Sequence, residues 1–133
     1  PVIDPTIEST LRLWRQTVHV YGHSDCLMSV ADYGALQVGK DVAARWRGTY
    51  ATEEAALKLV ADAGGAVALL GGALEEAGLR RVNDPRRGDC LVIRMASVEI
   101  GAIHLGDQVA ARLQRRVIEV RTSLVEILGA WRA

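Results

Sequence analysis

The sequence predicts an α+β fold in which N-terminal helices pack on a small C-terminal antiparallel sheet. Three observations lead to this prediction. Apolar residues recur at helical spacing through the first 79 residues. Turn chemistry then appears at Asp84-Pro85 and Gly88-Asp89. Short apolar runs of strand length follow these turns, so helices come first and strands come later.

The chain is long enough for one compact domain but too short for two, because it has 133 residues, of which 50% are hydrophobic. We find no internal repeat and no linker that would divide it. We therefore predict a single domain over 1–133, mainly helical over 1–79 and forming an antiparallel sheet over 88–121.

Two long helices are expected first. The first begins at Pro5 with Asp4 as its cap. The second begins after Ser24-Asp25, either of which can cap it, and runs to about Leu36. The expected apolar faces are Ile7, Leu11, Trp14 and Val18 on the first helix, and Leu27, Val30, Ala31 and Gly34 on the second.

Three shorter helices are expected next. Asp41 can cap a short helix over 42–48, Thr52 precedes a helix that stops at Gly64-Gly65, and a further helix over 66–78 is weakened by Gly71-Gly72. The side chains expected to face inward are Leu57, Val60, Ala61, Val67, Leu70 and Leu74.

Four strands are predicted, over 90–95, 98–105, 108–113 and 115–121. Gly106-Asp107 supplies a tight turn between the second and third. A last short helix is expected to start at Thr122. Trp131 follows it and has two alternatives: burial in its own domain, or burial against a neighbouring subunit.

Composition argues against several classes of function. Sixteen basic residues balance sixteen acidic ones, so no net field attracts nucleic acid or an anionic membrane, and we expect neither nucleic-acid binding nor membrane insertion. The N-terminus has no signal-peptide pattern, and no apolar run reaches the roughly 18 residues of a membrane span. Three arginine pairs are interpreted as solvated rims, with phosphate binding as the alternative: Arg80-Arg81, Arg86-Arg87 and Arg115-Arg116.

The cysteines and histidines do not predict a metal site or a cofactor. Two cysteines are too few for a disulfide framework. The four candidate ligands lack paired metal-binding spacing, so no metal is expected; they are His23, Cys26, Cys90 and His104.

A family resemblance rests on the order of several short motifs. Tyr21, Gly22, Asp25 and Cys26 precede a helix, Gly88-Asp89 opens a buried strand, and "IGAIHLG" ends a second strand at Gly106. This order, over roughly 19–121, resembles the NlpC-type papain-like cysteine peptidases, which cut bacterial cell-wall peptides. With "RGTYATEEAALKLV" and the terminal "GAWR", the chain looks most like a small family of bacteriophage tail proteins distantly related to those peptidases. The resemblance implies a reduced papain-like core.

In that family the cysteine at the helix start is the nucleophile and a strand histidine is its base. The resemblance makes Cys26 the candidate nucleophile, although the neighbouring Asp25 disfavours a thiolate. The family histidine falls on Ile100 when the strands are aligned at Gly106, and on Glu99 when they are aligned at Gly101. Neither residue can serve as the base.

His104 is the alternative base, on the same strand face as residue 100. Four strand residues cover about 13 Å, whereas a base must lie within about 3 Å of the thiol. His104 can therefore act only if the sheet is shifted by about four residues. His23 can act only if a tight turn brings it back to Cys26. We interpret Asp25, Gly22, Tyr21, Gly88 and Asp89 as cap and loop residues.

The resemblance implies a structural component of a siphophage-like tail, at or near the tail tip, that is assembled in the host cytoplasm and located in the virion. Its expected partners are other tail proteins in a symmetric ring. The alternatives are an active peptidoglycan endopeptidase that uses Cys26 and His104, and a cytoplasmic binding module with no virion role.

Overall fold

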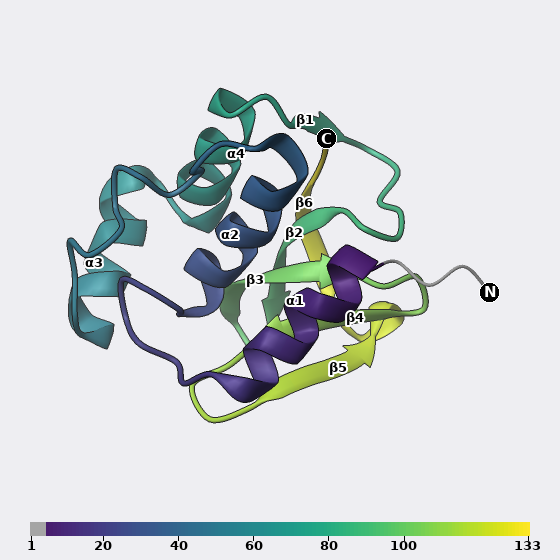
Figure 1. The fold of residues 1–133 in the computed structure, drawn as a ribbon, viewed down its shortest axis with the longest axis horizontal. Coiled ribbons are helices and arrows are strands. Elements are labelled where there is room, and N and C mark those ends of the chain that lie inside the picture. The colour runs from purple at the N-terminus through teal and green to yellow at the C-terminus, as the bar shows by residue number, and fades with distance from the viewer. Residues whose placement is uncertain (1–4) are drawn as a thin grey trace.

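The computed structural model describes residues 5–133, and in it the helices gather on one side of a single six-stranded sheet (Figure 1). The predicted α+β class is confirmed. The helices are α1 (Pro5–Gln16), α2 (Cys26–Val38), α3 (Glu53–Ala63) and α4 (Gly72–Glu76), with a π-helical turn, Val67–Gly71, leading into α4.

The sheet is antiparallel at every pairing. Its strand order is β1-β6-β2-β3-β4-β5, which places β2 and β3 at the centre. The strands are β1 (Arg80–Val82), β2 (Cys90–Met95), β3 (Val98–His104), β4 (Gln108–Arg112), β5 (Val117–Arg121) and β6 (Glu126–Arg132).

The helix α2 lies directly on β3. Gly101 permits this contact, because a Cβ there would lie 2.9 Å from the Cys26 carbonyl oxygen and 3.0 Å from Val30 Cγ2. Gly39 ends the helix in a left-handed conformation, with φ of 72°. The start of α2 is therefore fixed against the middle of the sheet.

Alternate residues of the central strands belong to two cores. Cys90, Val92 and Ile103 pack with the helices. The opposite face forms a second cluster, which also takes in residues of β4 and β6: Leu91, Ile93, Ile100, Ala102, Val109, Ala111 and Ala130. This alternation determines which strand side chains can reach α2.

The predicted C-terminal helix is wrong. Only Thr122–Leu124 is helical, as a single 3-10 turn, and Glu126–Arg132 forms β6. The cause is non-local: β6 pairs with β2, with Cys90 opposite Trp131. The sheet therefore extends beyond 88–121 in both directions. Trp131 is fully buried within this domain, so the first of its two predicted alternatives, burial in its own domain, is the one observed.

The predicted helix over 42–48 is also wrong, because this segment is a series of hydrogen-bonded turns. Asp41 does not cap a helix but pairs with Arg47, at 2.7 Å. Three residues expected on inner faces are exposed, namely Val18, Leu57 and Ala61. Val18 is 75% exposed because α1 ends two residues earlier, and Leu57 is 60% exposed on the peripheral α3 (Figure 1). The proposed cap Asp4 lies outside the described residues.

Within residues 5–133, no single helix has both the length and the apolar character to cross a membrane. The segments Glu53–Ala63 and Val67–Glu76 meet those two criteria only when they are taken together, across a bend of 72°.

Candidate functional site

Asp25 organises the loop before α2. Its Oδ1 caps the helix by accepting from the amides of Leu27 at 3.2 Å and Met28 at 3.0 Å. Its Oδ2 accepts the Gly22 amide at 2.8 Å and the Tyr50 hydroxyl at 2.5 Å. The carboxylate is only 4% exposed, so these four donors replace its water. Of the two residues predicted to cap α2, the structure selects Asp25.

The loop residues Tyr21 and Gly22 have different parts in this arrangement. Gly22 has a φ of 83°, and a Cβ on it would lie 2.3 Å from the Tyr50 carbonyl oxygen, so only glycine fits. The Tyr21 ring packs edge-on against His19, with their centroids 4.7 Å apart. Gly22 thus lets the loop of residues 20–25 pack closely against the Tyr50 backbone, whereas Tyr21 packs against His19.

Cys26 is the first residue of α2, as predicted, but its thiol is poorly suited to ionise. Burial raises its pKa to about 11, and the charge of Asp25 adds to this effect. Backbone hydrogen bonds from Gly101 and Leu27 act in the opposite direction without overcoming it. At neutral pH the sulfur is therefore a thiol, which is a weak nucleophile.

His104 does not face this thiol. Gly101 points toward α2, and His104 is three residues farther along β3, which places its side chain on the opposite face of the sheet. There its Nδ1 accepts the Gly106 amide at 3.0 Å. Burial lowers the pKa of His104, with Arg132 acting in the same direction and Asp89 against it. The structure thus separates the two predicted catalytic residues by a layer of sheet.

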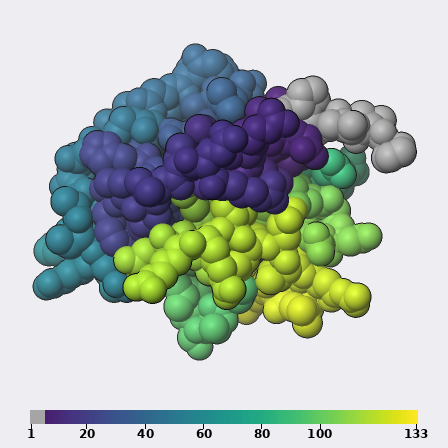
Figure 2. Space-filling model, turned by 60° about the horizontal axis from the view of Figure 1, so that its bottom comes forward, coloured from purple at the N-terminus to yellow at the C-terminus, as the bar shows by residue number. Residues whose placement is uncertain are grey.

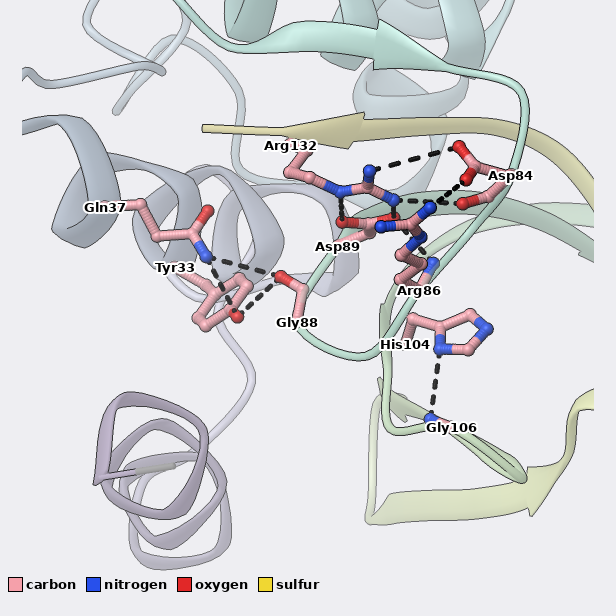
Figure 3. Close-up of polar contacts among 9 residues, drawn as sticks. All are labelled: Tyr33, Gln37, Asp84, Arg86, Gly88, Asp89, His104, Gly106 and Arg132. Atoms are coloured by element: carbon pink, nitrogen blue, oxygen red, sulfur yellow. Dashed lines mark hydrogen bonds and ion pairs between the residues drawn. The ribbon is translucent and has the colours of Figure 1, made fainter. Parts of the chain in front are cut away.

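The two residues are also at different levels along α2. The Gly88 amide donates to the His104 carbonyl at 2.8 Å, and the Gly88 carbonyl accepts the Tyr33 hydroxyl at 2.7 Å (Figure 3). Tyr33 is seven residues beyond Cys26, about 10 Å along the helix axis. This placement agrees with the prediction that His104 lies too far along its strand to reach Cys26. The position of the His104 side chain on the opposite face of the sheet separates the two groups further.

Glu99 is two residues before Gly101, so it lies on the same face of β3 as Gly101 and on the face opposite His104. Its Oε1 accepts the Ala66 amide at 3.1 Å, so it ties the helical segment after α3 to the sheet. Glu99 and Cys26 line the same apolar hollow of about 180 Å³, together with Tyr21 and Leu57. Gly101 is the β3 residue that contacts the thiol, and Glu99 contributes to the hollow a carboxylate that already has a structural hydrogen bond. Neither residue replaces the missing histidine.

Neither of the other two histidines supplies the missing base. His23 is exposed, its ring lies beside Gly48, and it does not line the hollow that Cys26 lines. Burial lowers the pKa of His19, whose ring packs on Tyr21. In the described part of the chain, no three His, Cys, Asp or Glu side chains are grouped so that they could hold a metal ion.

A second polar cluster lies at the end of the sheet where His104 is found (Figure 3). Asp89, only 1% exposed, accepts from Arg132 Nε and from one of its terminal nitrogens, both at 2.8 Å. The Arg86 amide donates to the same carboxylate at 2.8 Å. Asp84 completes the cluster through an ion pair with Arg86. Asp89 is therefore a structural anchor between the turn and β6, in agreement with its predicted loop role.

Two of these partners were not predicted from the sequence. Tyr50 comes 25 residues after the carboxylate it binds, and Arg132 comes 43 residues after Asp89. No local spacing links such pairs. The sequence predicts both aspartates to be cap or loop residues, which implies hydrogen-bond donors without saying where they come from.

Comparison with known proteins gives one match. A family model described as "Domain of unknown function (DUF6950)" matches residues 2–133. No curated protein and no solved structure matches the chain.

Proposed function

Since the chain belongs to the DUF6950 family, whose description names no activity, we propose its role from the geometry around Cys26. The protein is a structural component of a bacteriophage tail, at or near the tail tip. It is built on a reduced papain-like fold that has lost its catalytic base, and it acts through contacts with other tail proteins.

The observation that carries the loss of catalysis is the separation of Cys26 from His104. A cysteine peptidase needs a thiolate and a base within hydrogen-bonding reach. Here burial keeps the thiol protonated, and the imidazole lies on the other face of β3. Glu99 is bonded to the Ala66 amide on the face where a base is needed.

Two features support the papain-like part of the proposal. The resemblance expects a cysteine that starts a helix against an antiparallel sheet, and Cys26 starts α2 against Gly101 of β3. It also expects a Gly-Asp turn feeding a buried strand, and Gly88-Asp89 leads into the fully buried first half of β2. The tail assignment rests on the resemblance of the whole motif order and places the protein in the virion.

Purified particles test the tail role directly. Quantitative mass spectrometry of tails from the phage that encodes this chain is expected to find it at a fixed ratio to the tail-tube protein. A particle carrying Cys26→Ser is expected to assemble and infect normally, because the thiol has no chemical task. Absence of the chain from particles contradicts the tail role. Wall-lytic activity that disappears in Cys26→Ser contradicts the loss of catalysis and favours the peptidase.

A further inference from the structure

A hollow of about 590 Å³ lies between the end of α1 and the β4–β5 hairpin, and all its ionisable lining residues are basic. Figure 2 shows this hairpin, in yellow-green, lying directly against the purple α1. Among the described residues, no aspartate or glutamate lines the hollow. The basic side chains are Arg15, His19, Arg112, Arg115 and Arg116.

Arg112 is the unusual member of this set, because it is a buried charge without a counter-charge. Its residue is only 3% exposed. One terminal nitrogen donates to the Thr17 carbonyl at 2.6 Å, which is a neutral partner. In the described chain no carboxylate forms an ion pair with it, and burial alone lowers its pKa. A buried guanidinium normally requires a negative partner.

The rest of the Arg112 guanidinium is available to a ligand. Its other nitrogens have no protein partner in residues 5–133, yet they are not fully enclosed. Only Thr10 Oγ1 and Trp131 Nε1 are both enclosed and unpartnered. These Arg112 nitrogens are therefore not sealed from solvent. Arg112 lines the basic hollow and also two neighbouring ones, one of which it shares with Cys26 and Glu99.

The hairpin arginines add exposed charge above this buried one. Arg115 and Arg116 are exposed and have no ion pair in the described chain. Arg15 is already paired with Glu119, at 3.2 Å. The hollow therefore has three arginines that form no ion pair within residues 5–133. The other two arginine pairs differ, because Arg86 is paired with Asp84 and Arg81 lies over the Trp131 ring.

We propose that this hollow binds a multiply charged phosphate group, with Arg112 as the fixed donor at its base and Arg115 and Arg116 contacting the group from the hairpin. The planar guanidinium matches two phosphate oxygens at once, which a single ammonium cannot do. Three unpaired arginines suit a group with two or three negative charges better than a single carboxylate. The phosphate comes either as a free ion or as an ester on a larger molecule.

Calorimetric titration of the full chain tests this site, with sodium phosphate and sodium pyrophosphate as probes at constant ionic strength. Saturable binding is expected, tighter for pyrophosphate. Arg115→Gln combined with Arg116→Gln is expected to weaken it at least about tenfold. The matched control combines Arg80→Gln with Arg87→Gln, which removes the same charge from exposed positions elsewhere and is expected to leave affinity unchanged. No saturable binding, or equal losses in both double variants, overturns the site.

Two further arms separate the sources of the phosphate and the part of Arg112. Arg112→Lys keeps the charge but loses the planar guanidinium, so several-fold weaker phosphate binding is expected. Binding is measured under conditions in which thermal unfolding shows that the variant is folded. Unchanged affinity overturns the role of Arg112. If that variant does not fold, the hairpin double variant alone decides. A nucleoside diphosphate that binds like pyrophosphate supports an ester ligand, and weaker binding supports the free ion. Affinity for single-stranded DNA that increases with length and exceeds that of pyrophosphate overturns the proposal in favour of a nucleic-acid surface.

Discussion

The Tyr50 hydroxyl donates to Asp25 Oδ2, the same oxygen that accepts the Gly22 amide. Since Asp25 Oδ1 caps α2, the turn before α3, the loop before α2 and the α2 cap share one buried carboxylate. Both partners are nearly inaccessible to water, since Asp25 is 4% and Tyr50 is 9% exposed. The position of Cys26, the next residue in the chain, therefore depends on a tyrosine 25 residues away.

Replacing Tyr50 by phenylalanine tests this arrangement. The variant keeps the ring but leaves the buried carboxylate without one donor. We expect the free energy of unfolding to fall by about 2 kcal/mol, the usual worth of a hydrogen bond to a charged group. Chemical denaturation measures it. Tyr21→Phe is the control, because no hydrogen bond joins its hydroxyl to the described chain, and it is expected to change little. Equal effects of the two substitutions contradict the account.

Asp89 offers a second test, at the opposite end of α2. Asp89→Ala removes the acceptor of the Arg86 amide and of two Arg132 nitrogens. We expect the free energy of unfolding to fall by about 2 to 4 kcal/mol, because charge-assisted bonds to a buried group are lost. The matched control is Asp84→Ala, an exposed carboxylate of the same cluster, whose unfolding midpoint should barely move. A larger loss in Asp84→Ala contradicts the anchoring role of Asp89.

Adjacent glycines before and at the start of α4 are expected to respond in opposite directions. Gly71 and Gly72 both have right-handed helical angles. A Cβ on Gly71 would lie 2.3 Å from Trp131 Cζ2, whereas a Cβ on Gly72 meets nothing within 4 Å. Gly71→Ala should therefore destabilise the protein by about 1 to 3 kcal/mol through overpacking.

Gly72→Ala serves as the control for that substitution. Alanine reduces the freedom of the unfolded chain without a clash, so stability should rise by about 0.5 to 1 kcal/mol. Thermal unfolding of the two variants measures the difference in sign. A stabilised Gly71→Ala protein contradicts the packing of β6 and Trp131 against this helical segment.

Alkaline pH should weaken the fold, and Cys26 should contribute. Its pKa is raised from 9.0 to about 11, so its stabilising effect is complete below pH 9 and is lost as pH rises toward 11. Burial also raises the pKa values of Cys90 and Tyr50, which add to the same decline. Each such group adds a slope of at most about 1.4 kcal/mol per pH unit.

The variant Cys26→Ala isolates this contribution. Its absolute stability will differ, but the slope between pH 9 and 11 is the relevant quantity, and it should be shallower than that of the wild type. Denaturant titrations at several pH values measure both slopes. Identical slopes would show that the thiol ionises in the folded protein as readily as in the unfolded one.

Local chemistry made much of the fold predictable from the sequence. Asp25, one of the two predicted caps, caps α2, and α3 begins after Thr52 as expected, because a cap acts on amides two or three residues away. The strands of residues 90–121 have the predicted order, because the turn at Gly106-Asp107 and the apolar runs are also local signals.

The rest depends on contacts between distant residues. The segment after Thr122 carries no decisive periodicity, and it becomes β6 only because β2 offers it an open edge. Alternation in β4 placed Val109 and Ala111 on one face, which left Arg112 on the helix-covered face. No local pattern predicts a buried arginine there, since its partner is a carbonyl 95 residues earlier.

The most direct test of the central claim is the rate at which Cys26 reacts with iodoacetamide, measured against pH in a Cys90→Ala background. The account predicts a rate at pH 7 well below that of free cysteine, increasing up to about pH 11, and unaffected by His104→Ala. A rate at pH 7 above that of free cysteine, with a plateau that His104→Ala removes, would contradict it and identify a working catalytic pair.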